Sequence, residues 1–229
     1  IFADKRDTKD QLAFSFLGLL GAQFGFYYTI SLCNAATATV RQYTSPVFVM
    51  LWMSFKSRSL PEGREFLGII FALVGVFLIS THGDINNVVL SPEALVIGLI
   101  SAVSLAFYTV QPMRLLQKFS TTLVVGWGQL LSGTLLCFFV NPFEPTGSWD
   151  TGAVIAFIYL VIGATVLSYS LFLVGLKVVG STKASLISCA EPLASIIAVV
   201  LWLKTPLTAV DLIGMACIII TVILLSIPK

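Results

Sequence analysis

The sequence has a single histidine, His82, and no HExxH pattern. His82 falls in a segment that we expect to be a loop, so a buried serine–histidine pair and a histidine-ligated zinc site are excluded. No pair of aspartates lies within an apolar segment, which excludes acid catalysis of the aspartyl type inside the membrane. We therefore expect no enzymatic activity, no metal site and no cofactor.

Charge is also scarce. Only 10% of the residues are charged, the net charge is +2, and no run of five lysines or arginines occurs. A nucleic-acid-binding protein needs a basic patch, so nucleic acid is excluded as a partner. The four cysteines lie far apart, all in apolar runs: Cys33, Cys137, Cys189 and Cys217. That placement favours thiols that face lipid or the protein core over a disulfide or a metal site.

Hydrophobic residues, in contrast, make up 57% of the 229 positions, and soluble domains carry roughly 25% charged residues and fewer apolar ones. A bilayer core of about 30 Å requires about 20 apolar residues per helix. Eight stretches meet that requirement, at 11–31, 35–55, 65–82, 93–113, 121–140, 152–174, 181–202 and 208–227. The sequence therefore predicts an all-α polytopic membrane protein with eight transmembrane helices in a lipid bilayer.

Helix start and stop signals separate these stretches. Ser91, Pro92 and Glu93 place a cap, a proline and an acid at one helix start. Thr208 and Asp211 have the spacing of a capping box, with aspartate in place of the usual glutamate or glutamine. Two prolines at 141–145 prevent a helix from continuing, so we expect a loop there.

Lysine and arginine are distributed unequally between the connections, which fixes the orientation. One set of connections, with the tail, holds eleven of the thirteen: Lys5, Arg6, Lys9, Lys56, Arg58, Arg64, Arg114, Lys118, Lys177, Lys183 and Lys229. The alternate set holds only Lys204, and Arg41 lies within a span. Basic loops stay on the cytoplasmic side, so both ends of the chain are expected in the cytoplasm. We expect a multi-pass protein of the cell membrane, in this case the plasma membrane of a bacterium.

The two halves of the chain match at a gap-free shift of 146 residues. The shift superposes Pro46 on Pro192, Ala38 on Ala184, Arg58 on Lys204, Glu65 on Asp211 and Gly68 on Gly214. It passes five helices, an odd number, so equivalent helices should cross the membrane in opposite directions. The sequence thus predicts an inverted-topology repeat with a substrate site near the midplane, between the repeats.

The boundary between the repeats falls near residue 90, which gives a first repeat at 1–90 and a second at 91–229. The second repeat has five helices and the first has three, because helices 93–113 and 121–140 have no counterpart. Their counterparts would precede Ile1, so we expect two further helices, and ten in the intact protein.

Five short motifs carry a resemblance to a known family. They are Glu191-Pro192-Leu-Ala-Ser-Ile-Ile-Ala, Trp202-Leu-Lys-Thr-Pro-Leu-Thr, Asp211-Leu-Ile-Gly214, Ser45-Pro46-Val-Phe and Glu65-Phe-Leu-Gly68. In these the chain resembles the drug/metabolite transporter superfamily, specifically its ten-helix EamA-type transporters. The resemblance implies a basket of helices around a central cavity, with 65–82 and 208–227 at the periphery. Ser45 and Thr205 replace acids that this family often has, so a symmetric mechanism with two carboxylates is not implied.

The interpretation that follows is a secondary transporter that works by alternating access between the two repeats. The resemblance implies export of a small-molecule substrate, namely amino acids or related metabolites. A non-transporting helix-bundle scaffold or a channel is the alternative. Proton coupling and a homodimer are both left open.

Glu191 is the sharpest candidate for a substrate contact. It lies ten residues into helix 181–202, or about 15 Å, which is near the bilayer centre. A carboxylate at this depth is costly and rarely faces lipid. Serines continue a polar stripe on the same helix face, at Ser181, Ser185, Ser188 and Ser195. Glu191 would bind a substrate amine or exchange a proton; alternatively, it is a protonated acid that hydrogen-bonds a neighbouring helix.

Pro46 and Pro192 break two helices at equivalent positions. Each removes one backbone donor, so the carbonyls of Gln42 and Ser188 lose their helical partner. Free carbonyls at the midplane can bind a cation or a substrate amine. The alternative is a simple kink whose carbonyl is satisfied by nearby serines.

Gln42 and Ser45 form the matching stripe of helix 35–55, and we expect them to line the site. Arg41 flanks that stripe. It would hold a substrate carboxylate or pair with Glu191, or else extend to the outer headgroups.

Gln23 and Tyr169 are counterparts in the two repeats, and Trp127 is a further amphipathic residue within a span. Together they suggest a cavity for a small polar or aromatic metabolite. Each alone is also typical of a hydrogen bond between helices or of an interfacial anchor.

Overall fold

The computed structural model of the chain describes residues 1–33, 35–58, 60–84, 92–139, 149–194, 197, 201 and 208–226. Some features expected from the sequence lie outside these residues: the cap at Ser91, the loop at 141–145, and Ser195, Lys204 and Thr205. Every regular element in the described part of the chain is a helix.

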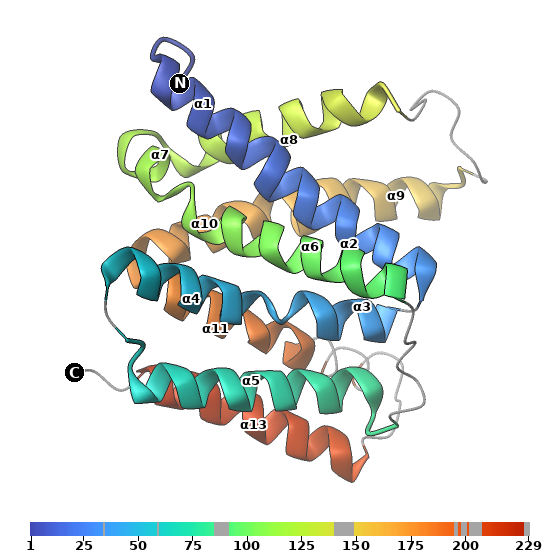
Figure 1. The fold of residues 1–229 in the computed structure, drawn as a ribbon. Helices are drawn as coiled ribbons and strands as arrows, with labels where there is room; N and C mark the ends of the chain where they lie inside the picture. Colours follow the sequence, from blue (N-terminus) through green and yellow to red (C-terminus); the bar gives the residue numbers. More distant parts are fainter. Residues whose placement is uncertain are drawn as a thin grey trace.

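The helices form a bundle in which α5 and α13 lie together at one edge (Figure 1). The first half contains α1 (Lys5–Ala13), the π-helical segment η1 (Phe14–Leu20), α2 (Gly21–Leu32), α3 (Ala35–Gln42), α4 (Ser45–Ser57) and α5 (Gly63–Thr81). The second half contains α6 (Pro92–Val110), α7 (Met113–Lys118), α8 (Thr121–Cys137), α9 (Thr151–Tyr159), the π-helical segment η3 (Leu160–Leu167), α10 (Ser168–Val179), α11 (Ser181–Ile187), the 3-10 turn η4 (Ser188–Ala190) and α13 (Ala209–Ser226).

Several helices are long and apolar enough to cross a membrane. Within the described residues these are Lys5–Leu32, Gly63–Thr81, Pro92–Lys118 and Thr151–Val179, and two shorter apolar helices are Thr121–Cys137 and Ala209–Leu224. The remaining two predicted spans are interrupted, 35–55 by the turn between α3 and α4 and 181–202 by η4. The chain is therefore a polytopic α-helical membrane protein, as its sequence predicts.

Departures from regular α-helix recur at the shift of 146 residues. The π-helical segments begin at Phe14 and at Leu160. Helix α3 ends at Gln42, and its counterpart α11 gives way to the 3-10 turn at Ser188. Such distortions are rare inside helices and are found mostly at functional sites. The two halves thus share their local distortions as well as their sequence pattern.

Helices α5 and α13 form the most extensive helix–helix contact in the described chain. The Thr221 hydroxyl donates to the Gly68 carbonyl at 3.2 Å, and Gly75 lies against the backbone of Gly214. Gly75 is the counterpart of Thr221, and Gly214 is the counterpart of Gly68, so the two contacts are equivalent under the shift of 146 residues. Gly68 contacts Thr221 and Gly75 contacts Gly214, so residue numbers rise along α5 as they fall along α13. The two counterpart helices therefore run antiparallel, and Figure 1 shows them side by side.

Both of these helices begin with a reciprocal cap at equivalent positions. At the start of α5, the Glu62 N–H donates to the Glu65 carboxylate at 3.3 Å. At the start of α13, the Thr208 N–H donates to the Asp211 carboxylate at 3.0 Å, and the Asp211 N–H donates to the Thr208 hydroxyl at 3.2 Å. The predicted capping box is thus confirmed. Asp211 is buried and also bonds His82, the residue that follows α5, at 2.8 Å.

Replacing Asp211 by alanine is expected to destabilise the protein more than the same change at its counterpart, Glu65. Loss of a cap costs about 1 kcal/mol, and Asp211→Ala also removes the bond to His82 that joins α13 to the end of α5. Thermal unfolding of both variants in detergent measures the difference. Equal shifts of the unfolding midpoint would show that the bond to His82 contributes nothing.

Ion pairs join α1 to α7. Arg114 donates to Asp7 and to Asp10, both at 2.6 Å, and Lys118 donates to Asp7 at 3.1 Å. The Asp7 side chain is buried, so its charge depends on these partners. In the sequence, Arg114 and Lys118 serve only to indicate orientation, and their pairing with aspartates of α1 could not be predicted.

The long helices of the two halves differ in how they are covered. On α2, the Ser101 hydroxyl of α6 donates to the Ala22 carbonyl at 2.9 Å. The counterpart of Ala22 is Ser168 at the start of α10, and it is exposed. No residue of α9 or η3 is buried. The face of α9, η3 and the start of α10 is therefore exposed in the described chain, whereas α2 packs against α6.

Candidate functional site

A hydrogen bond joins the two interrupted spans at their breaks. Tyr43 lies in the turn between α3 and α4, and Glu191 follows η4. The Tyr43 hydroxyl donates to a carboxylate oxygen of Glu191 at 2.6 Å, a length typical of a charge-assisted bond. Both breaks lie just before a proline, Pro46 or Pro192, which lacks the N–H that a continuous helix needs. The bond therefore forms where the sequence predicts that the helices are interrupted.

The Ser188 carbonyl is not left free, so the expectation of an open carbonyl at this break is wrong. The chain tightens into the 3-10 turn, and the Glu191 N–H donates to the Ser188 carbonyl. The Ser188 hydroxyl donates to the Ser185 carbonyl at 2.7 Å. The Ser181 hydroxyl donates to the Thr109 carbonyl of α6 at 3.2 Å. Serines 181 and 188 of the polar stripe thus bond the backbone, whereas the Glu191 side chain bonds the other half of the protein.

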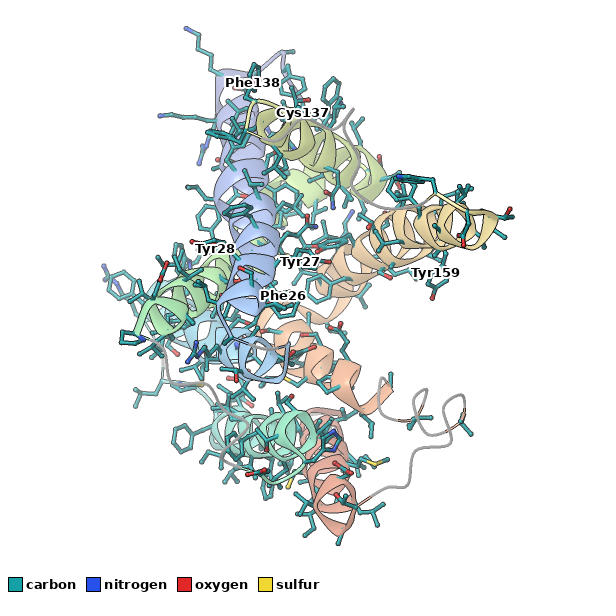
Figure 2. All side chains as sticks on the ribbon, turned by 90° about the vertical axis from the view of Figure 1, so that its right-hand side faces the viewer. Phe26, Tyr27, Tyr28, Cys137, Phe138 and Tyr159 are labelled. Atoms are coloured by element: carbon teal, nitrogen blue, oxygen red, sulfur yellow. The ribbon has the colours of Figure 1, made fainter. Side chains whose placement is uncertain are left out.

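Gln23 and Tyr169 lie next to this hydrogen bond. The Gln23 side chain lies close to the Tyr169 hydroxyl, and Tyr27 and Glu191 both lie within electrostatic range of Tyr169. Figure 2 shows Tyr27 on the side of α2 that faces α9 and α10. Tyr108, which is buried in α6, packs edge-on against Tyr169 with ring centroids 5.7 Å apart. Tyr27 of α2 and Tyr108 of α6 therefore both lie near Tyr169 of α10.

Counterpart positions meet each other at this site. Gln23 lies close to Tyr169, which is 146 residues further along the chain. Tyr43 contacts Glu191, two residues from its own counterpart at 189. In α5 and α13 the buried counterparts Ala72 and Ile218 belong to one apolar cluster. Equivalent residues lie near one another only beside a two-fold axis, so this proximity is consistent with a pseudo-two-fold relation between the two halves.

The residues expected to line the site from helix 35–55, Arg41, Gln42 and Ser45, have no described contact with Glu191. Ser45 is buried at the start of α4, and Gln42 is half-buried at the end of α3. Arg41 is buried, and its side chain packs against Gly98 of α6. Protein therefore covers the Arg41 side chain, and α6 lies against it at Gly98.

Trp127 also lies apart from the carboxylate. Its ring packs edge-on against Phe2, with centroids 4.8 Å apart, near the start of the chain. Of the residues that the sequence proposes for the site, the described contacts bring together Glu191, Tyr169 and Gln23.

Sequence reasoning missed Tyr43, the residue that bonds Glu191 directly. A signal was present, because Tyr43 follows another polar residue, Thr39, by four positions and would lie on the same face of a helix over 35–55. An aromatic residue inside an apolar span is common, however, so the pattern gave no reason to single it out.

The arrangement is suited to binding. It offers one carboxylate, one amide and several phenolic hydroxyls, which can accept or donate hydrogen bonds and hold a cation. Within the described residues no group of three or more histidines, cysteines, aspartates or glutamates is placed to hold a metal ion.

Comparison with known proteins agrees with this architecture. A model of the EamA-like transporter family matches residues 2–81 and 93–227. The uncharacterized inner membrane transporter YicL of Salmonella typhimurium is 38% identical over the whole chain, which spans 76% of that relative. The uncharacterized transporter YyaM of Bacillus subtilis is 28% identical over 96% of the chain and 76% of the relative.

A solved protein structure also matches the fold. It aligns with a TM-score of 0.79 over 93% of this chain and 75% of that chain, at 20% sequence identity. At that identity the likeness bears on the arrangement of helices alone.

Proposed function

Because the chain belongs to the EamA-like transporter family, we propose that it is a secondary transporter that moves small metabolites such as amino acids by alternating access. The observation that carries the proposal is the hydrogen bond between Tyr43 and Glu191, which links the breaks of two spans from different halves. Broken helices at the midplane, between repeats, are the usual setting of a transporter binding site.

The breaks supply the mobility that alternating access needs. A helix interrupted by a turn can change direction at that turn without losing its remaining hydrogen bonds. Glu191 and Tyr43 come from opposite sides of the repeat boundary, so their bond can lengthen or break when the halves rock against each other. The site is thus built from groups that the proposed movement would bring together and separate.

We also propose the direction of transport and the membrane in which the protein works. The chain works as an exporter in the plasma membrane of a bacterium, with its N-terminal end and the end of α13 on the cytoplasmic side. The uneven distribution of lysine and arginine supports that orientation. The two repeats, 1–90 and 91–229, are the units that move, and no chemical reaction on the substrate is involved.

Solute flux in liposomes tests this function. The purified chain is reconstituted into liposomes, which are loaded with a set of radiolabelled amino acids and related amines. Flux of each solute is measured with and without an imposed proton gradient. Saturable flux that responds to the gradient is expected. Flux that rises linearly with concentration would indicate a channel instead, and no flux of any solute would indicate a scaffold.

A further inference from the structure

The turn between α4 and α5 exposes two large apolar side chains. Phe55, near the end of α4, is 89% exposed, and Leu60, in the turn itself, is 92% exposed. The turn lies at the end of the bundle that also carries the N-terminus and α7 (Figure 1). A turn between two spans lies at the membrane surface, where an apolar side chain avoids water only by entering the lipid. These two residues therefore favour contact with the bilayer.

Three basic side chains accompany the two apolar ones. Lys56 and Arg58 lie at the end of α4, and Arg64 lies in the first turn of α5. All three are exposed, and within the described residues none of them forms an ion pair. Bases beside a membrane surface attract anionic headgroups.

The backbone of Arg58 is left-handed, with φ at 52°, and its N–H donates to the Ser54 carbonyl. This conformation ends α4 and is the one that glycine adopts most readily, because a Cβ crowds the neighbouring carbonyl. An arginine at such a position carries a backbone cost, which points to a role for its side chain.

The acids of the same segment are engaged by the backbone. The Glu62 N–H donates to the Glu65 carboxylate at 3.3 Å, and the Glu62 side chain accepts a hydrogen bond from the Glu65 N–H. This capping box satisfies N–H groups at the start of α5. The carboxylates are thus held at the helix start, and the three bases face outward toward an anion from outside the chain.

The counterpart connection in the second half has a different composition. Only Arg58 has a basic counterpart, Lys204, because Trp202 and Val210 occupy the positions equivalent to the other two bases. The group of three bases therefore belongs to one end of the bundle, and the pairing of α5 with α13 does not require it.

We propose that the turn between α4 and α5 binds the headgroup of an anionic phospholipid. The phosphate lies against Lys56, Arg58 and Arg64, while Phe55 and Leu60 enter the acyl region beside it. A zwitterionic headgroup binds less tightly, because its own ammonium group offsets the phosphate charge. Inorganic phosphate also binds less tightly, because it has no acyl chain to contact the apolar residues. The inference goes beyond the proposed function, since lipid binding does not depend on transport.

Three additives test the class of ligand. The unfolding midpoint of the purified chain in detergent is measured as phosphatidylglycerol, phosphatidylcholine with the same acyl chains, or inorganic phosphate is added. Phosphatidylglycerol is expected to raise the midpoint saturably, with an apparent affinity at least fivefold higher than that of either alternative. Equal effects of the two lipids, or of phosphatidylglycerol and phosphate, would overturn the proposal.

Removing the three charges tests the place of binding. Lys56→Gln, Arg58→Gln and Arg64→Gln together are expected to weaken phosphatidylglycerol binding at least fivefold. All three side chains are exposed, so the midpoint without lipid should change little. Unchanged binding by this variant would show that the headgroup lies elsewhere.

The bases of α1 provide the matched control. Lys5→Gln, Arg6→Gln and Lys9→Gln together remove the same charge from exposed positions at the same end of the bundle (Figure 1). These bases alternate with aspartates along the chain, so most of the binding should be retained. An equal loss in both triple variants would show that binding follows net charge alone, and it would overturn a site at this turn.

The apolar part of the site has its own test. Phe55→Ser and Leu60→Ser are expected to weaken phosphatidylglycerol binding severalfold, because serine cannot replace the contact with acyl chains. Both side chains are almost fully exposed, so the midpoint without lipid should stay the same. Full binding by the double variant would contradict the insertion of these residues into the lipid.

Discussion

Replacing Glu191 by glutamine is expected to reduce saturable flux at least tenfold. Glutamine has the same shape and can still accept the Tyr43 hydrogen bond, but it can neither pair with an ammonium group nor exchange a proton. The ionised carboxylate is the form that holds the cation.

Flux of a labelled amine in liposomes, measured across a series of pH values, checks this result. Glu93→Gln is the control for the chemical change, since Glu93 is an exposed carboxylate at the start of α6. Ser45→Ala alters the counterpart of Glu191 and should reduce flux less, because a buried hydroxyl carries no charge. Normal flux by Glu191→Gln at every pH would show that the carboxylate has no part in transport.

Alanine at Gly75 or Gly214 is expected to destabilise the protein by about 1–3 kcal/mol, the usual cost of overfilling a packed contact. A Cβ at Gly75 would lie 2.8 Å from the Gly214 carbonyl oxygen and 2.7 Å from Ile218. A Cβ at Gly214 would lie 3.0 Å from the Gly75 carbonyl oxygen. Backbone atoms cannot move aside as a flexible side chain can, so α5 and α13 would have to separate.

Thermal or denaturant unfolding in detergent measures this effect. Gly126 and Gly133 are matched controls in α8, because a Cβ at either has no atom within 4 Å. Alanine there should leave stability unchanged or raise it, since alanine favours helix over glycine. Equal behaviour of all four variants would show that the close crossing of α5 and α13 does not contribute to stability.

The two expected effects concern different parts of one arrangement. The glycine contact holds the counterpart helices α5 and α13 at the edge of the bundle, where Figure 1 shows them paired. The hydrogen bond of Glu191 lies between the two broken spans. A rigid contact at the periphery and an exchangeable one at the centre are consistent with two halves that rock against each other.

Local properties of the chain could be read from the sequence alone. The apolar stretches predict the helices, because a backbone in lipid must satisfy its own hydrogen bonds. Pro46 and Pro192 predict where two spans break, because proline lacks an N–H. The spacing of Thr208 and Asp211 predicts the cap of α13, which the structure contains. The shift of 146 residues anticipates that distortions recur at equivalent positions.

Contacts between distant residues needed the tertiary structure. Tyr43 and Glu191 are 148 positions apart, and only the packing of α4 against α11 decides which side chain meets the carboxylate. The Ser188 carbonyl finds its partner because the chain tightens into a 3-10 turn, which the proline alone does not dictate. Arg41 packs against Gly98 because glycine leaves room on α6. The sequence determined which segments are helical and where they break, because those are local properties of the chain. The rotation and crossing of each helix depend on the whole bundle, and they decide which of the polar residues form a site.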